Sequence, residues 1–245
     1  MPADLVRDLT DTTVAITGAT SGIGRQTARQ LVGRGANVVL LGRRKERLDD
    51  LVAELGADRV ATVAGDVSQP SDNQAMVRAA VEHFGRLDSL IANAGIGAYG
   101  GILDHTDTQL VEMVETNLLG TIWSVRAAVP AMLAAGGGDI VIVSSVAGLR
   151  GGANEAVYAA TKFGQAGLAG AIDRELREKS IRVTTICPAA VSTEFAMGNG
   201  RTEGDPWLDD VMTPDDVALA IVYTLAQPRR LRTQTWSLWS MAESS

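Results

Sequence analysis

The sequence predicts an α/β fold: a doubly wound, mostly or wholly parallel sheet of seven strands with helices on both faces. Short β-branched runs alternate with helical patterns along the chain, and this alternation is typical of a covered parallel sheet. A chain of 245 residues with 46% hydrophobic content has enough apolar residues for one large core. No linker, repeat or low-complexity tract divides it, so we expect a single domain over residues 1–245.

The expected elements follow from the hydrophobic periodicity. Strands are expected near 12–17, 37–41, 59–64, 88–92, 139–144, 182–187 and 234–238. The longest helical patterns cover residues 108–134 and 156–178. The stretch near 190–212 is the loosest part of the chain, and surface loops of this kind often close over a site. We therefore expect a lid there.

A glycine-rich turn joins the first expected strand to a helical stretch from about residue 25 to 32. Its sequence is Gly18-Ala19-Thr20-Ser21-Gly22-Ile23-Gly24. Strand, turn and helix in this order point backbone N–H groups and a helix dipole at a phosphate. Gly18 allows the tight turn, Gly22 lets the backbone approach a pyrophosphate, and Gly24 lets the helix pack on the strand. The spacing G-x-x-x-G-x-G differs from G-x-G-x-x-G, but its position indicates a Rossmann-type dinucleotide site.

The second expected strand ends in Gly42-Arg43-Arg44, with no acidic residue before Glu46. In sites selective for NAD an acidic side chain near this point bonds the ribose 2′-hydroxyl, whereas arginine accommodates a 2′-phosphate. The turn therefore predicts NADP(H), with Arg43 paired to the phosphate and Arg44 beside it. The alternative is that both arginines only begin a solvated helix.

Tyr158 and Lys162 are one helical turn apart, and Ser145 follows the fifth expected strand. Residues at i and i+4 share a helix face, so the ammonium can lie beside the phenol. A nearby positive charge lowers the pKa of a tyrosine from about 10, toward the range of a working general acid. An aromatic ring that packs inward with a lysine beside it is the alternative explanation. Lysine is rare here, however, since the other basic residues apart from Lys45 and Lys179 are arginines.

Composition excludes several other classes of function. The net charge of −7 and the pI of about 4.9 disfavour nucleic acid and anionic membranes as partners. No signal-peptide core or membrane-spanning run is present, so we expect a cytoplasmic protein. His83, His105 and the single cysteine, Cys187, form no metal-ligand pattern, and Cys187 lies in an apolar run that predicts burial.

Several motifs together resemble the short-chain dehydrogenase/reductase family over nearly the whole chain. They are Thr17-Gly18-x-x-x-Gly22-Ile23-Gly24, Asn93-Ala94-Gly95, Asn117, Ser145, Tyr158-x-x-x-Lys162 and Pro188-x-x-Val191-x-Thr193. Two positions depart from the family's usual pattern: Ala92 stands where Asn is common, and Ala189 where Gly is common.

The resemblance implies a catalytic set of Asn117, Ser145, Tyr158 and Lys162. Tyr158 would be the general acid, Ser145 would orient the carbonyl, Lys162 would also bond the nicotinamide ribose, and Asn117 would hold a water. Ser145 is preferred to Ser144 because adjacent strand residues face opposite ways and only Ser145 has the family's spacing. The implied cofactor contacts are Gly18, Thr20, Ser21, Gly22, Ile23, Gly24, Arg43, Arg44, Asp66, Val67, Asn93, Ala94, Gly95, Tyr158, Lys162, Pro188, Val191 and Thr193.

These observations predict an NADP(H)-dependent oxidoreductase that interconverts a small carbonyl compound and a secondary alcohol. A 3-oxoacyl-carrier-protein reductase is the alternative within the class. A non-catalytic dinucleotide-binding regulator is less favoured because all four catalytic positions are present, and an epimerase or dehydratase would carry a G-x-x-G-x-x-G turn. Residues expected to border the substrate are Tyr99, Leu149, Glu155, Phe195 and Trp207, which suggests a partly apolar site with one carboxylate.

The helix expected at 156–178 carries small residues on more than one side, including Gly167 and Gly170. Each interior glycine costs about 1 kcal/mol relative to alanine, which close approach of another backbone would offset. Part of this small surface must face the sheet. The excess predicts a homo-oligomer, a tetramer or a dimer, in which this helix and the one at 108–134 pack against their copies.

Overall fold

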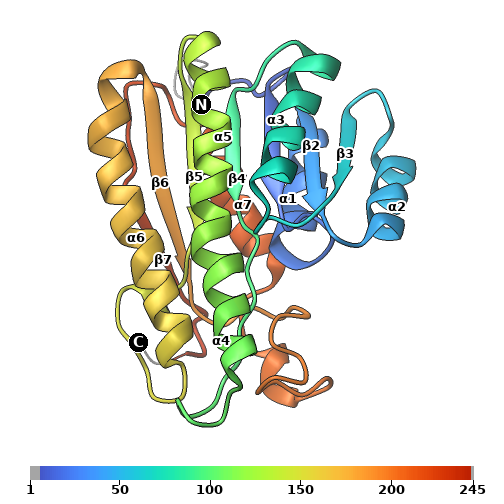
Figure 1. Ribbon diagram of the computed structural model, residues 1–245. Coiled ribbons are helices and arrows are strands. Elements are labelled where there is room, and N and C mark those ends of the chain that lie inside the picture. Colours follow the sequence, from blue (N-terminus) through green and yellow to red (C-terminus); the bar gives the residue numbers. More distant parts are fainter. Residues whose placement is uncertain (1–5, 244–245) are drawn as a thin grey trace.

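The computed structural model describes residues 6–243 and shows a seven-stranded sheet between two layers of helices (Figure 1). The strand order is β3-β2-β1-β4-β5-β6-β7, and every neighbouring pair is parallel. The strands are β1 Thr13–Thr17, β2 Asn37–Gly42, β3 Val60–Ala64, β4 Ser89–Ala92, β5 Gly138–Val143, β6 Ile181–Pro188 and β7 Thr235–Leu238. The predicted fold class is confirmed, and each strand lies within a residue or so of its expected place.

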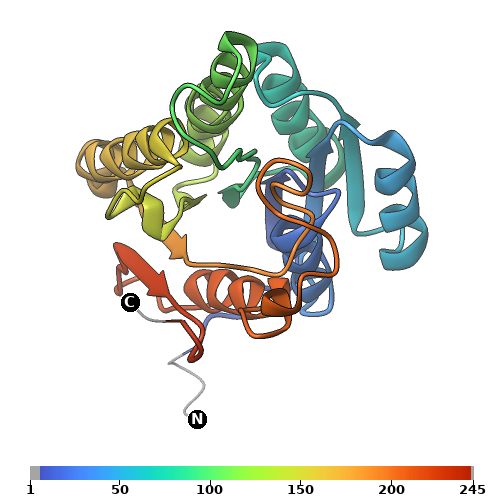
Figure 2. The same ribbon diagram turned by 90° about the horizontal axis from the view of Figure 1, so that it is seen from below.

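The helices are α1 Gly22–Val32, α2 Lys45–Leu55, α3 Pro70–Phe84, α4 Asp107–Val114, α5 Gly120–Ala134, α6 Ala156–Leu176 and α7 Pro214–Leu225. Alternate strand residues face opposite sides of the sheet, so each side has its own core. Val14 and Ile16 of β1 pack with α1, α2 and α7, whereas Ala15 packs with α3, α5 and α6. Figure 2 shows these two layers on either side of the sheet.

The helix predicted at 108–134 is interrupted. A π-helical turn, Glu115–Leu119, separates α4 from α5. One extra residue per turn rotates Asn117 inward, where it is fully buried. Its side chain then bonds both backbone groups of Ile96, through Oδ1 at 2.8 Å and Nδ2 at 2.9 Å. These bonds to a distant loop stabilise a turn that helical periodicity does not predict.

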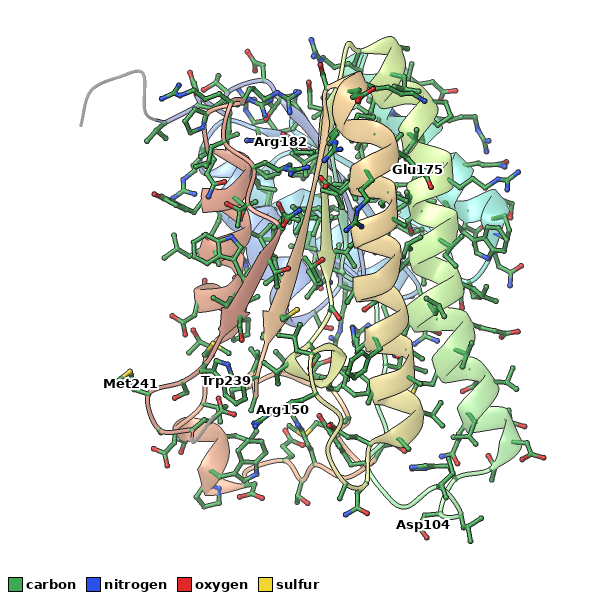
Figure 3. The ribbon with its side chains drawn as sticks, turned by 90° about the vertical axis from the view of Figure 1, so that its left-hand side faces the viewer. Asp104, Arg150, Glu175, Arg182, Trp239 and Met241 are labelled. Atoms are coloured by element: carbon green, nitrogen blue, oxygen red, sulfur yellow. The ribbon has the colours of Figure 1, made fainter. Side chains whose placement is uncertain are left out.

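A buried carboxylate, Asp139, stands at the amino end of β5. It accepts hydrogen bonds from Arg7 at 2.9 Å, Arg182 at 2.6 Å and Arg229 at 2.9 Å. These arginines come from the N-terminal segment, from β6 and from the chain after α7. Figure 3 places Arg182 at this end of the sheet, far from Arg150 and Trp239 at the other end.

Among the described helices, none is both long and apolar enough to cross a bilayer.

Candidate active site

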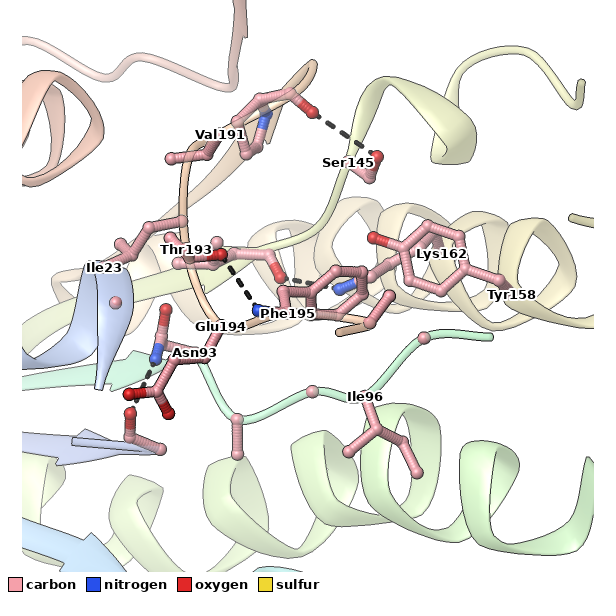
Figure 4. Close-up of a pocket in the computed structure, with 18 of the residues that line it drawn as sticks. Ile23, Asn93, Ile96, Ser145, Tyr158, Lys162, Val191, Thr193, Glu194 and Phe195 are labelled. Carbon is pink, nitrogen blue, oxygen red and sulfur yellow. Dashed lines mark hydrogen bonds between the residues drawn. The ribbon is translucent and has the colours of Figure 1, made fainter. Parts of the chain in front are cut away.

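A cavity of about 990 Å³ opens at the carboxyl ends of the parallel strands (Figure 4). Its walls come from the β1–α1 turn, the ends of β2, β4, β5 and β6, the start of α6, and the segment after β6. The carboxyl edge of a doubly wound sheet is where such folds bind ligands. All of the predicted cofactor contacts except Gly24 line this cavity.

The glycine turn packs against the loop after β4. Gly18 has a φ of +66°, and a Cβ there would lie 2.8 Å from the Cα of Ala94. Gly24 supports the turn from behind, since a Cβ there would collide with the Gly18 carbonyl and the Asn93 amide. Thr17 fixes the approach, because its Oγ1 accepts from the backbone N–H of both Asn93 and Ala94 at 3.0 Å. The turn and the Asn93-Ala94-Gly95 loop therefore form one surface.

The amino end of α1 meets this surface without a side-chain cap. Ser21 is the N-cap residue, but its hydroxyl bonds no amide of the first turn. That hydroxyl instead accepts from the Arg44 guanidinium at 2.8 Å. The first amides of α1 thus have no side-chain partner, which is the arrangement that binds phosphate at a helix N-terminus.

Arg43 and Arg44 follow β2 and line the cavity, but their environments differ. Arg43 is exposed. Arg44 donates to Thr20 Oγ1 at 2.8 Å and to Glu194 at 2.9 Å, while Arg47 also donates to Glu194 at 2.8 Å. The two guanidiniums, Arg47 first, lower the pKa of the Glu194 carboxyl. A carboxylate from the segment after β6 is therefore held at the turn where the sequence predicts a phosphate.

The predicted catalytic hydroxyls converge at the middle of the cavity. Ser145 follows β5; its Oγ accepts from Ala147 N at 3.1 Å and donates to Pro188 O at 3.4 Å. Ser144 turns away and donates to the Lys162 carbonyl at 3.1 Å. Tyr158 lies in the first turn of α6 with only 7% of its surface exposed. Figure 4 shows Ser145, Tyr158 and Lys162 facing the same space.

Lys162 and Tyr158 share a helix face as predicted, but their electrostatics differ from the prediction. Lys162 is 3% exposed, donates to Val143 O at 3.1 Å, and places Nζ 5.5 Å from the centroid of the Tyr158 ring. Burial lowers the pKa of Lys162 to about 8 and raises the pKa of Tyr158. The expected lowering of the Tyr158 pKa is therefore wrong for this structure: loss of hydration raises that pKa, and the effects that oppose the rise come from the Ser145 hydroxyl and Arg201.

Asn117 supports the site from behind and does not line the cavity. Besides its bonds to Ile96, its Nδ2 donates to Thr161 Oγ1 at 3.1 Å, and its carbonyl accepts from Gln165 Nε2 at 2.8 Å. Thr161 and Gln165 lie on α6, on either side of Lys162 in the sequence. Asn117 therefore ties the catalytic helix to the loop after β4.

The segment after β6 closes the opposite wall. Val191 and Thr193 line the cavity, and Thr193 Oγ1 accepts from Phe195 N at 3.2 Å. Two aromatic rings contact the Tyr158 ring. The centroid of Phe195 lies 5.6 Å from that of Tyr158, and the centroid of Tyr99 lies 6.2 Å from it. Figure 4 shows Phe195 beside Tyr158.

Four of the five expected substrate-side residues line the cavity: Tyr99, Glu155, Phe195 and Trp207. Leu149 does not; it is 46% exposed, and the expectation for it is wrong. Sequence reasoning missed the cavity residues Arg150, Glu194, Arg201, Trp239 and Glu243. They lie in irregular segments where no periodicity marks an inward direction, so the sequence pattern does not identify them.

Comparisons with known proteins agree with this geometry. Residues 12–204 match the family model described as short chain dehydrogenase. An uncharacterized oxidoreductase of Staphylococcus aureus is 32% identical over 223 residues, which cover 91% of this chain and 94% of the relative.

Two solved structures extend the likeness. An alcohol dehydrogenase of the archaeon Thermococcus sibiricus, complexed with 5-hydroxy-NADP, has a TM-score of 0.87 and 27% identity, covering 96% of this chain and 98% of the other. A 3-ketoacyl-(acyl-carrier-protein) reductase of Brucella melitensis, complexed with NADH, has a TM-score of 0.84 and 28% identity, covering 94% and 98%. The chain belongs to the short chain dehydrogenase family and is an oxidoreductase.

Proposed function

We propose that this protein interconverts a carbonyl compound and a secondary alcohol with NADP(H) as the hydride carrier. The observation that carries the proposal is the convergence of Ser145, Tyr158 and Lys162 beside a glycine-lined nucleotide cavity. Family membership and the cofactors of the two solved structures support it.

The cavity fits a nicotinamide dinucleotide. Side chains at Gly18 and Gly22, which have φ of +66° and +51°, would be strained, and one at Gly18 would collide with Ala94, so the turn keeps its backbone open for a pyrophosphate. The uncapped amino end of α1 supplies amide donors and a positive dipole end. Asp66 and Val67 would border the adenine, and Pro188, Val191 and Thr193 the carboxamide end.

Selectivity for NADP(H) is proposed from the arginines after β2. Arg44 already binds a carboxylate oxygen of Glu194 at 2.9 Å, so its guanidinium is oriented for an anion. Arg43 is exposed and carries no carboxylate at its guanidinium within residues 6–243. The two side chains together suit a 2′-phosphate.

When bound, the nicotinamide supplies or accepts the hydride at C4. In the reducing direction Tyr158 donates its phenolic proton to the carbonyl oxygen as the alcohol forms. Ser145 donates a hydrogen bond to the same oxygen and fixes its orientation. Lys162, buried beside the ring, would hold the nicotinamide ribose, and its positive charge would stabilise the tyrosinate that remains. Asn117 positions α6 and the loop after β4, and the segment 190–212 acts as a lid that excludes water.

A 3-oxoacyl-carrier-protein reductase is the second candidate, favoured by the structural likeness to the Brucella melitensis enzyme. Both candidates use the same chemistry and differ in the group attached to the carbonyl. A carbonyl panel with free acids, esters and acyl thioesters separates them.

Replacement of Tyr158 by Phe tests the chemistry directly. It removes only the hydroxyl, so NADPH binding should persist while turnover falls by at least about 10²-fold. Tyr223→Phe is the matched control, since Tyr223 is 54% exposed on α7 and remote from the cavity. Loss of nicotinamide absorbance measures turnover, and quenching of protein fluorescence measures binding. Near-normal turnover in Tyr158→Phe would exclude this mechanism.

A further inference from the structure

Arg201 is a charged side chain that the proposed mechanism does not use. It lies in the segment after β6, lines the cavity and is half-buried. Its Nη1 donates to Val191 O at 2.9 Å. No carboxylate of residues 6–243 lies within 4.0 Å of its guanidinium, whereas the buried carboxylates Asp139 and Asp173 both have arginine partners. A half-buried cation loses part of its hydration, and without a counter-ion nothing compensates for that loss. An anionic ligand would compensate for it.

Three aromatic rings hold this guanidinium in place. Its Cζ lies 5.8 Å from the ring centroid of Tyr99, 5.7 Å from that of Phe195 and 5.4 Å from that of Trp207. Cation–π contacts with three rings orient a planar guanidinium without neutralising its charge. The remaining N–H groups keep the fork geometry that suits a carboxylate.

The same rings connect Arg201 to the proton donor. Tyr99 and Phe195 each contact Arg201 and also the Tyr158 ring, at 6.2 Å and 5.6 Å between centroids. Each of these two rings therefore links Arg201 to Tyr158. Its charge also opposes the rise that burial causes in the pKa of Tyr158. A carbonyl at Tyr158 and an anionic group at Arg201 can belong to one small molecule.

The carboxylates that line this end of the cavity are already engaged. Glu155 Oε1 accepts from Gly152 N at 2.6 Å. Glu243 accepts from Ala190 N at 3.1 Å and from Ser240 N at 3.2 Å. Arg150 is exposed and stacks on Trp239, with its Cζ 5.0 Å from the ring centroid (Figure 3). With Lys162 assigned to the nicotinamide ribose, Arg201 is the cation that shares aromatic contacts with Tyr158.

We propose that Arg201 binds the carboxylate of the substrate, so that the enzyme acts on oxo acids and hydroxy acids. This inference rests on the proposed function and narrows it to anionic substrates. The proposal also disfavours acyl thioesters as substrates, because the thioester group stands in place of the carboxylate and carries no charge.

The test compares hydroxy acids of four to six carbons with their methyl esters, using NADP⁺. The acid and its ester have the same reacting alcohol and differ in the charge at Arg201. We expect kcat/KM to favour the acid by about ten- to a hundredfold, through KM, and Arg201→Met to bring the ratio of acid to ester kcat/KM close to one. Arg201→Lys should restore part of it, because charge returns without the planar fork.

Calorimetry gives a measurement of binding that does not depend on catalysis. The ligand is the unreactive short-chain carboxylate that best inhibits turnover, or the acids themselves if no turnover occurs. Binding to the unmodified protein that weakens at least tenfold in Arg201→Met supports the assignment. Equal use of acid and ester, equal binding by both proteins, or loss of acid preference in Arg150→Met but not in Arg201→Met would overturn it. Absence of turnover with every compound would count against the proposed function, while the binding comparison would still decide the role of Arg201.

Discussion

Lys162 places an ammonium in the core at a cost to folding. Its pKa of about 8 in the folded chain lies below the ordinary value of 10.5 because burial penalises the charged form. Between these two values the unfolded chain holds a proton that the folded chain has released. Stability contributed by this group therefore rises with pH through that window, and below about pH 8 the penalty is fully present.

We expect Lys162→Met to abolish turnover and to relieve this penalty. The shift corresponds to roughly 3 kcal/mol at pH 7, less about 1–3 kcal/mol for the Val143 carbonyl left without its donor. The pH dependence is the sharper measurement. The difference in unfolding free energy between variant and unmodified protein should fall by about 2 kcal/mol between pH 7 and pH 9.5.

Urea unfolding at the two pH values measures this difference, and Lys179→Met, at an exposed lysine, is the control. The control should show no such change. A difference for Lys162→Met that does not vary with pH would show that Lys162 titrates normally in the folded chain.

Single residues show how much of the candidate site the sequence predicts. Tyr158, Lys162 and Ser145 were predicted because their types and spacing specify the chemistry. Arg201 was not, because its position depends on three rings brought from separate segments. The pKa of Tyr158 was predicted in the wrong direction because burial depends on packing that spacing alone does not encode.

At the scale of elements, the segment after β6 is linked to the turn after β2 by one acidic residue. Glu194 bonds Arg44 across 150 positions of sequence and bonds Arg47 as well. This ion pair joins the proposed lid to the proposed 2′-phosphate site. The Glu194 carboxylate therefore competes with a phosphate for the same guanidinium.

We predict that Glu194→Gln tightens NADPH binding about two- to fivefold and leaves NADH binding unchanged, since an exposed ion pair contributes up to about 1 kcal/mol. Glu203→Gln, at an exposed acid of the same segment, controls for net charge. Fluorescence titration with both cofactors measures the affinities. Weaker NADPH binding would mean that Glu194 orients Arg44 for the phosphate and does not compete with it.

The elements also mark the limit of prediction from periodicity. Seven strands were placed correctly because β-branched runs recur between helical patterns. The π-helical turn at Glu115–Leu119 was missed, since its extra residue is stabilised by bonds from Asn117 to Ile96, a distant partner. The alternation of elements is local information, whereas this turn depends on a tertiary contact.

At the scale of the molecule, α5 and α6 lie side by side on one face (Figure 1). On α6 a Cβ at Gly167 would meet nothing within 4 Å, and Phe163 is 47% exposed. This part of the small surface thus does not pack on the sheet. It fits the proposal that these helices contact their copies in a homo-oligomer.

Gly167→Trp should therefore fold as a protomer but shift the assembly to a smaller mass. Asp50→Trp on α2, at the opposite edge of the sheet, is the control that should keep the native mass. Light scattering at micromolar concentration measures both. A monomeric mass for the active unmodified enzyme would refute the assembly proposal.

Strand β5 runs from an arginine cluster at one end of the sheet to the cavity at the other end. Asp139 at its amino end gathers three arginines, and Ser145 follows its carboxyl end. Because the arginine cluster anchors the N-terminal segment, β6 and the chain after α7 without lining the cavity, changes in the cavity loops leave that anchor intact. Such a scaffold tolerates repeated exchange of the residues around Tyr158, so new substrate ranges can arise by descent without a new fold.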